Sequence, residues 1–183
     1  AASYSYTDPT LKLSAESNTL HLTEDGKYYK REPWAWDIET YTIAREYALL
    51  RQKLIPYLYT EACNYSKLGK PLIQPIYYGN PEIYDEPDYR NEYYFGKELF
   101  IAPITKKSDT TMNRSIERIY LPKGTWYDFK SGKKFIGDKR YVAFYKYDEY
   151  PVFAKAGSIV PMTVLDEDIN DLSSPKKMEI NIF

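Results

Sequence analysis

Four acidic residues are gathered in one short segment of the chain, at Glu82, Asp85, Glu86 and Asp88. The segment follows a mostly apolar run at residues 71–78. If that run is a strand of a parallel barrel, the carboxylates lie at the C-terminal face, where barrel active sites are built. One interpretation is a cleft-rim or sugar-contacting loop, with Glu82 and Asp85 as candidate contacts. The favoured interpretation is a solvated acidic loop, because charged loop residues are mostly exposed.

A second candidate for chemistry is aromatic. Tyrosine occurs 21 times, and Trp34 and Trp36 flank Ala35. An aromatic ring with a polar tip suits half-wet surfaces and stacking on sugar rings, so Trp36 is a third candidate for substrate binding. The competing interpretation is that these two tryptophans fix the entry of the following helix, as a hydrophobic staple does. Most tyrosines are expected at the edge of a core or at an interface.

Several function classes are excluded by composition. Cys63 and His21 are each the only residue of their type, so the chain cannot form an internal disulfide, a cysteine zinc site or a site with several histidines. The 25 basic and 26 acidic residues balance, which argues against nucleic-acid binding. No apolar run approaches the ~20 residues that span a bilayer, and residues 1–10 do not resemble a signal peptide. A cytoplasmic location is therefore expected.

The elements that must position these residues begin with a helix. Asp37 is a suitable N-cap, and Gly69 stands where a C-cap glycine is expected. Apolar residues recur at three- and four-residue spacing between them, at positions 43, 47, 50, 54 and 58. Pro56 lacks a backbone donor and predicts a kink or a break near Ile55. The run at 71–78, bounded by glycines, predicts a buried strand, and a helix followed by such a strand is typical of a parallel α/β fold.

The pattern changes after residue 98. Short strand-like runs, separated by turn residues, predict an antiparallel β-sandwich. They lie at 99–104, 115–121, 125–129, 141–147, 152–155 and 158–162. Trp126, Tyr127, Phe129, Phe144 and Phe153 are expected to fill its core or its seam with a neighbouring domain. Residues 166–177 are polar and predict a linker, and residues 178–183 alternate like a further strand.

Six stretches of the sequence together resemble glycoside hydrolase family 31, the α-glucosidase and α-xylosidase family. The resemblance spans residues 31 to about 162, and the stretches follow the family's order and spacing. They are REPW at 31–34, LRQKLIPYLYT at 50–60, GKPLIQPIYY at 69–78, FGKELFIAPI at 95–104, YLPKGTWYDF at 120–129 and PVFAKAGSIVPM at 151–162. The chain departs from the family at Gln74, where the family has an arginine.

The resemblance implies a mixed α and β fold, in which a terminal helix/strand portion of a (β/α)8 barrel is followed by an antiparallel β-sandwich. It places the end of the catalytic barrel at 1–96, the proximal C-terminal sandwich at 97–172, and a linker with the first strand of a distal β-domain at 173–183. A complete barrel typically needs about 250 residues, so most of it lies outside this chain.

The family is a retaining one, and its catalytic aspartates are expected on barrel strands that precede this chain. No catalytic residue is therefore assigned, and His21 does not match the family's substrate-binding histidine. The resemblance implies no metal or organic cofactor. The partners it implies are an α-linked gluco-oligosaccharide for the full-length enzyme and the rest of the barrel, with no nucleic acid and no membrane. The alternative function is a stand-alone carbohydrate-binding β-sandwich that uses a Tyr and Trp face.

Overall fold

The structure is a computed structural model that describes residues 12–13, 21–22, 37–165 and 175–183. The chain forms two compact units, residues 1–49 and residues 50–183, and each is described by itself. In the first unit, β1 (Lys12–Leu13) pairs antiparallel with β2 (His21–Leu22). The same unit holds most of α1 (Ile38–Lys53). No helix of the described residues is long and apolar enough to cross a membrane.

The predicted helix and its break at Pro56 are confirmed. α1 ends at Lys53, and α2 (Ile55–Leu68) begins after Leu54, whose φ is −78° and ψ 1°. The Thr40 backbone N–H donates to the Asp37 carboxylate at 2.8 Å, which satisfies one free donor of the first turn. Gly69 ends α2 with a φ of 67°, the left-handed conformation that glycine adopts without strain.

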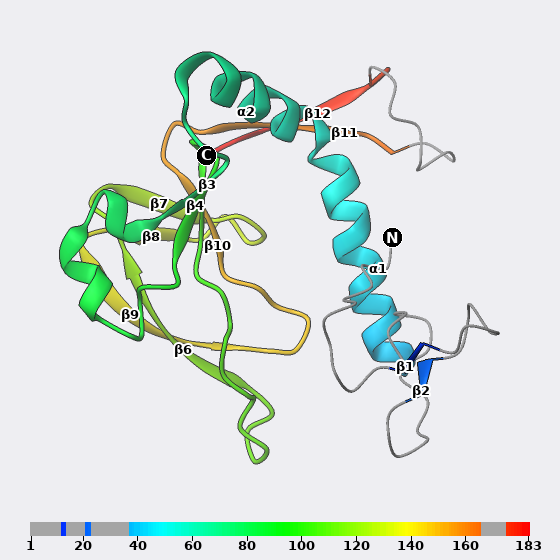
Figure 1. The fold of residues 1–183 in the computed structure, drawn as a ribbon, viewed down its shortest axis with the longest axis vertical. Coiled ribbons are helices and arrows are strands. Elements are labelled where there is room, and N and C mark those ends of the chain that lie inside the picture. Colours follow the sequence, from blue (N-terminus) through cyan, green and yellow to red (C-terminus); the bar gives the residue numbers. More distant parts are fainter. Residues whose placement is uncertain (1–11, 14–20, 23–36, 166–174) are drawn as a thin grey trace. The chain divides into compact units, whose positions relative to one another are not determined.

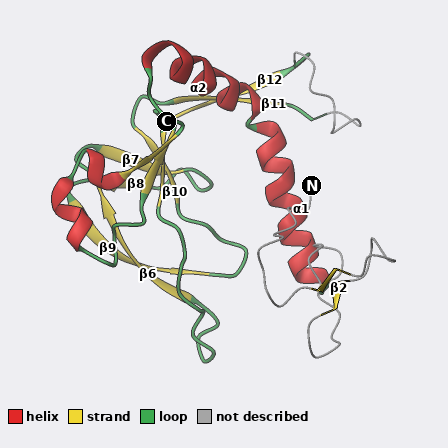
Figure 2. Ribbon diagram, in the orientation of Figure 1, coloured by secondary structure: helices red, strands yellow, loops and turns green. Residues whose placement is uncertain are grey.

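An antiparallel sheet of six strands is the centre of the second unit (Figures 1 and 2). Its order is β3-β4-β5-β10-β7-β8. The three strands that come first in the sequence therefore join the three later ones through the pairing of β5 with β10. The bounds are β3 Ile73–Pro75, β4 Tyr93–Phe95, β5 Leu99–Ile101, β7 Thr125–Asp128, β8 Lys134–Ile136 and β10 Val152–Lys155.

Two antiparallel ribbons complete the second unit. β6 (Ser115–Leu121) pairs with β9 (Lys139–Tyr145), and β11 (Ile159–Thr163) pairs with β12 (Met178–Ile182). β6 alternates as a half-buried strand should: Glu117 and Ile119 are buried, whereas Ile116 and Arg118 are exposed. Figure 1 shows α2 running alongside β11 and β12, and α2 and β11 are in contact.

The central sheet is covered on both faces. One core contains Phe100, Phe153 and Trp126, together with Ile119 and Leu121 from β6. The other core contains Leu99, Ala154 and Val160 with Tyr57 from α2. Neighbours along β5 and β10 therefore point into different cores, as the period of two along a strand requires. The fold is a mixed α and β structure whose larger part is an antiparallel β-sandwich, as predicted.

Three details differ from expectation. The strand predicted over 71–78 is shorter: β3 ends at Pro75, and a 3-10 turn, η2 (Ile76–Tyr78), follows. It is an edge strand paired antiparallel with β4, and Ile73 is 55% exposed, so it is not covered on both faces by the described residues. Proline suits such a place because it has no donor for a second neighbour. Phe144 lies on the outer face of β9 and is 55% exposed, so it is not part of the core, and its place in a seam with a neighbouring domain stays a prediction. β4 and β8 were not predicted.

Candidate functional site

The acidic segment forms a 3-10 turn, η3 (Pro81–Asp85), and the loop that follows it. Ile83 anchors the turn in the core with 1% of its surface exposed. Its neighbours Glu82 and Asp85 are exposed, and neither takes part in an ion pair of the described residues. The Glu82 carboxylate accepts a hydrogen bond from the Asn80 amide at 3.4 Å. The structure thus places both predicted carboxylates at the surface, on one short turn.

The other two carboxylates of the segment are held by cations from the β6–β9 ribbon and the loop before it. Arg140 donates to Glu86 at 2.7 Å, and this bond raises the pKa of the Arg140 guanidinium. Lys106 and Arg118 donate to the two oxygens of Asp88 at 2.8 and 2.9 Å. These hydrogen bonds, that of Lys106 first, lower the pKa of Asp88. Glu86 and Asp88 therefore fasten the acidic segment to the ribbon.

Two further carboxyl groups are buried and have one oxygen without a hydrogen-bond partner among the described residues. Glu92 is 2% exposed and accepts the Tyr120 backbone N–H at 2.9 Å with Oε1, while its Oε2 has no partner in the described part of the chain. Burial raises the pKa of Glu92 to about 9, and the bond from Tyr120 opposes this only in part. Glu117 is also buried with Oε1 unpartnered, and burial raises its pKa against the pull of Lys106. At neutral pH Glu92 is a neutral acid inside the core.

The chemistry that these carboxyl groups could perform is limited by whether a substrate can reach them. Retaining glycoside hydrolysis needs two carboxyl groups about 5–5.5 Å apart that both reach the sugar. Within the described ranges, the carboxyl groups with a raised pKa are sealed in the interior, while those at the surface are exposed or ion-paired. Nor do the described residues contain a group of three or more His, Cys, Asp or Glu side chains able to hold a metal ion.

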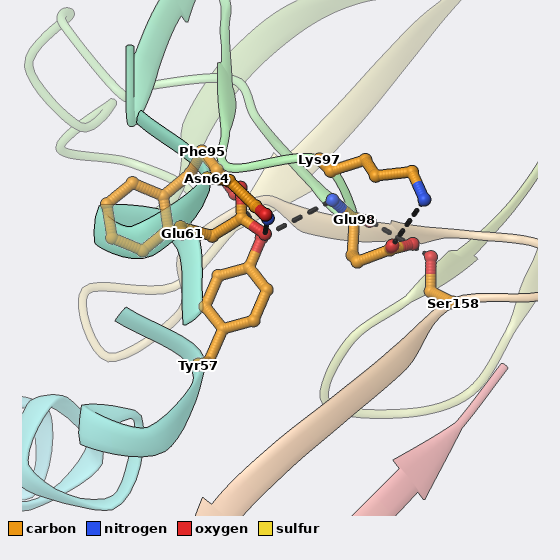
Figure 3. A network of polar contacts seen from close by, with 7 residues as sticks. All are labelled: Tyr57, Glu61, Asn64, Phe95, Lys97, Glu98 and Ser158. Atoms are coloured by element: carbon orange, nitrogen blue, oxygen red, sulfur yellow. Dashed lines mark hydrogen bonds and ion pairs between the residues drawn. The ribbon is translucent and has the colours of Figure 1, made fainter. Parts of the chain in front are cut away.

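A polar network around Tyr57 joins α2 to the β4–β5 turn (Figure 3). The Tyr57 hydroxyl donates to the Phe95 carbonyl at 2.6 Å and accepts the Glu98 backbone N–H at 3.3 Å. Around it, Asn64 donates to Glu61 at 3.2 Å, and Ser158 donates to the Glu98 carbonyl at 3.3 Å. Burial raises the pKa of Tyr57, so its hydroxyl remains a donor. Each of these hydrogen bonds joins two groups of the protein itself, and together they hold α2 against the sheet.

Gly96 explains why this network fits. Its φ is +69°, and a Cβ there would collide with the Tyr57 hydroxyl and lie 2.7 Å from Glu61 Cγ. Only glycine has both the left-handed conformation and the missing side chain that the approach requires. The FG pair at 95–96 belongs to one of the family motifs, but no local pattern reveals that it packs against Tyr57, which lies 38 residues before Phe95.

Trp36, the third predicted contact, lies outside the described residues. The structure brings together three tyrosines that had not been predicted as site residues, Tyr77, Tyr78 and Tyr84. Tyr84 lies on η3, the turn that also carries Glu82 and Asp85. The available signal was the Tyr-Tyr pair that directly follows the apolar run. Glu92 was missed because nothing in its sequence neighbourhood distinguishes a buried glutamate from an exposed one.

Comparison with known families matches two adjoining models. A model described as the glycosyl hydrolase family 31 C-terminal domain matches residues 69–160, and one described as the glycosyl hydrolases family 31 TIM-barrel domain matches residues 18–61. The first covers half of the chain. The two matches have the order that the sequence motifs predicted, with the end of a barrel before a β-rich domain.

Individual relatives are similar over most of this chain and a small part of their own. An α-xylosidase of Saccharolobus solfataricus is 30% identical over 152 residues, which cover 82% of this chain and 20% of that protein. An isomaltosyltransferase of Sporosarcina globispora is 33% identical over 161 residues, which cover 85% of this chain and 14% of that protein. A family 31 dextranase of Flavobacterium johnsoniae, solved with isomaltotriose, has a TM-score of 0.71 and 29% identity, covering 83% of this chain and 18% of that one. The chain spans about a fifth or less of these relatives.

Proposed function

The chain belongs to glycosyl hydrolase family 31, and we propose that it is the C-terminal part of a retaining, α-glucosidase-like glycoside hydrolase. In this proposal the fragment itself is structural and lacks the catalytic aspartates. The whole enzyme hydrolyses O-glycosyl bonds of an α-linked gluco-oligosaccharide by double displacement, with one carboxyl group as nucleophile and a second as acid and then base. The domain limits at 96 and 172 and a cytoplasmic location stay predictions.

The observation that carries the proposal is the variety of relatives that share this part. They are named for removal of xylose, for transfer of isomaltosyl groups and for cleavage of dextran. Similarity over 82–85% of this chain therefore accompanies different reactions and sugars. A segment common to hydrolases and transferases is better suited to holding a catalytic domain than to choosing its substrate.

The ion pairing and burial of the carboxyl groups also support a structural role for this chain. Glu86 and Asp88 are engaged by cations, and Glu92 is closed off from solvent. The Tyr57 network and the ion pairs both join one secondary-structure element to another. The alternative is a stand-alone sugar-binding sandwich that uses a Tyr and Trp face. Trp126, the tryptophan within the described residues, is not available to such a face, because it is 2% exposed and its indole N–H donates to the Pro122 carbonyl at 2.7 Å.

The test is hydrolysis of p-nitrophenyl α-D-glucopyranoside and the matching α-xyloside by the 183-residue chain, beside the full-length product of its gene. We expect release of nitrophenol by the full-length protein alone. Glu82→Gln and Asp85→Asn serve as control variants of the exposed carboxylates. Turnover by the chain that either variant abolishes would contradict the proposal, as would a full-length protein that cleaves neither substrate nor any α-linked gluco-oligosaccharide.

A further inference from the structure

Two short turns precede β4, and a buried side chain anchors each of them in the core. η2 (Ile76–Tyr78) and η3 (Pro81–Asp85) each insert one isoleucine fully into the core, Ile76 at 0% and Ile83 at 1% exposure. The Ile76 carbonyl accepts the N–H groups of Gly79 and Asn80, both at 3.1 Å, so the link between the turns is also hydrogen-bonded. The ion pair of Glu86 with Arg140 holds the end of the second turn. The outward-facing side chains of η2 and η3 therefore belong to turns whose backbone is anchored to the core and to the β6–β9 ribbon.

Three tyrosine rings carried by these two turns are in contact. Tyr77 contacts Tyr78 with ring centroids 5.4 Å apart and planes at 72°, and it contacts Tyr84 at 5.2 Å and 83°. Tyr77 is half-buried, whereas Tyr78 and Tyr84 are 63% and 60% exposed. Single exposed aromatic residues are ordinary, whereas these exposed rings are joined through Tyr77 into one patch, and a contiguous exposed patch is a candidate for binding.

Two carboxylates accompany the rings. Glu82 and Asp85 lie on the same short turn as Tyr84, two residues before it and one residue after it in the sequence; both are exposed, and neither is neutralised by an ion pair of the described chain. They differ in this from Glu86 and Asp88, which are paired. A carboxylate without a cation accepts hydrogen bonds from hydroxyl groups readily. Aromatic rings and hydroxyl acceptors carried by the same two turns fit a ligand with an apolar ring face and hydroxyls around its edge, which is the chemistry of a pyranose sugar.

We propose that Tyr77, Tyr78 and Tyr84, with Glu82 and Asp85, form a binding site for a pyranose residue of a neutral gluco-oligosaccharide. The inference rests on the proposed function for the class of sugar, and goes beyond it because it gives this part of the chain a ligand of its own. A C–H face of the sugar stacks on an exposed tyrosine ring, and sugar hydroxyls donate to the two carboxylates. Because the turns are anchored, little conformational entropy is lost when the sugar binds.

The test is a titration of the isotopically labelled 183-residue chain with isomaltotriose, followed by NMR shifts of the tyrosine rings and backbone amides. We expect shifts concentrated at residues 76–85 and a dissociation constant in the range of about 1–10 mM. Tyr84→Ala should weaken binding about two- to twelvefold, since an aromatic contact contributes about 0.5–1.5 kcal/mol beyond its area. Glu82→Gln combined with Asp85→Asn should weaken it about threefold. Tyr59→Ala, at a 72% exposed tyrosine on α2, is the matched control and should leave binding unchanged.

The proposal is overturned by the absence of shifts at about 20 mM isomaltotriose. It is equally overturned if Tyr84→Ala and Tyr59→Ala have the same effect, or if the patch binds an oligolysine peptide in a salt-sensitive manner and no sugar. The outcome is separate from that of the hydrolysis assay. An inert chain that binds no sugar refutes this site alone, whereas a chain that cleaves glucosides refutes the structural role and leaves the site open to the same titration.

Discussion

Residues 50–183 and the helical residues 38–49 differ in what they bury. The first region encloses side chains on both faces of its six-stranded sheet. In α1 no residue is buried, although Ile43 and Leu50 belong to one apolar stripe. The stripe acquires a core only near its end, where Leu50 and Leu54 pack against the cluster that contains Tyr57. An amphipathic helix gains its stability chiefly from the face it buries.

This difference indicates which region of the chain contributes most to its stability. The β-rich region supplies its own core and can position side chains without help. The apolar face of α1 is of the kind that is covered by further structure, which accords with a helix taken from the end of a barrel. Substitutions in the two regions should therefore have unequal effects, and the following predictions are arranged from the largest to the smallest.

The largest effect is expected from Trp126→Ala. Trp126 is 2% exposed, contacts Phe100 at 5.5 Å between ring centroids, and has its indole N–H satisfied by Pro122. Removing a buried large aromatic side chain costs about 3–5 kcal/mol of the free energy of unfolding. Urea denaturation measures this. Ile38→Ala, at a 77% exposed position of α1, is the contrast and should change the value by less than about 0.5 kcal/mol. Equal losses would remove the distinction between the two regions.

Gly96→Ala should cost about 3 kcal/mol, because it adds a collision with Tyr57 and Glu61 to a left-handed backbone. Gly132→Ala isolates the backbone contribution: Gly132 has a φ of +70° with nothing within 4 Å of its Cβ position. That control should lose about 1 kcal/mol. The difference between the two variants in urea denaturation measures how tightly α2 is held to the sheet. If they lose the same amount, the close approach of Tyr57 has no energetic consequence.

Glu92→Gln should alter the pH dependence of stability. The carboxyl group releases its proton near 4.5 in the unfolded chain but holds it to about 9 in the core. Between these values the unfolded state binds fewer protons, so wild-type stability falls as the pH rises. Glutamine has no proton to lose. Relative to wild type the variant should gain about 2 kcal/mol or more between roughly pH 5 and pH 8.

Thermal or urea unfolding across that range measures the Glu92 effect, and Glu82→Gln at the exposed turn is the matched control, expected to follow the wild type. A constant difference between wild type and Glu92→Gln at every pH would mean that the Glu92 carboxyl is already ionised in the folded protein, and that the core around Tyr120 admits water.

Asp88→Asn should have the smallest effect of the series. Lys106 and Arg118 lower the pKa of Asp88, so the stabilisation they give is present above its ordinary value of 3.8 and is lost as the pH falls through the folded-state pKa. Both cations are more than half exposed, and salt screens such pairs. The melting temperatures of wild type and variant should converge in about 1 M NaCl and at low pH. A difference that grows in salt would show that the pairs are not screened by solvent.

Much of the β-region was predictable because turn residues separate its strands. The runs that predicted β6 and β10 have the bounds of the observed strands, and β9 and β11 differ by one or two residues. β4 was missed because Tyr93–Phe95 follows the acidic segment without a turn glycine or an alternating pattern. The strand predicted at 71–78 was wrong in extent, since an apolar run does not reveal that its second half forms a 3-10 turn.

The candidate site was predictable only in part. Exposure of Glu82 and Asp85 followed from their place in a polar loop. Capture of Glu86 by Arg140, 54 residues away, depends on the pairing of β6 with β9, which no local pattern specifies. The buried state of Glu92 depends in the same way on the Tyr120 backbone. Phe144 was expected in the core or in its seam with a neighbouring domain, and the register of β9 turns it away from the core.

Native-state hydrogen exchange of the 183-residue chain tests most directly the claim that residues 50–183 carry the core and α1 does not. Amides of β5 and β10 should exchange only through global unfolding, and those of residues 39–49 should exchange through local opening, at rates that do not follow the global stability. Trp126→Ala should then speed exchange in β5 and β10 and leave residues 39–49 unchanged. Equal protection of α1 and β10, with equal sensitivity to Trp126→Ala, would contradict the account.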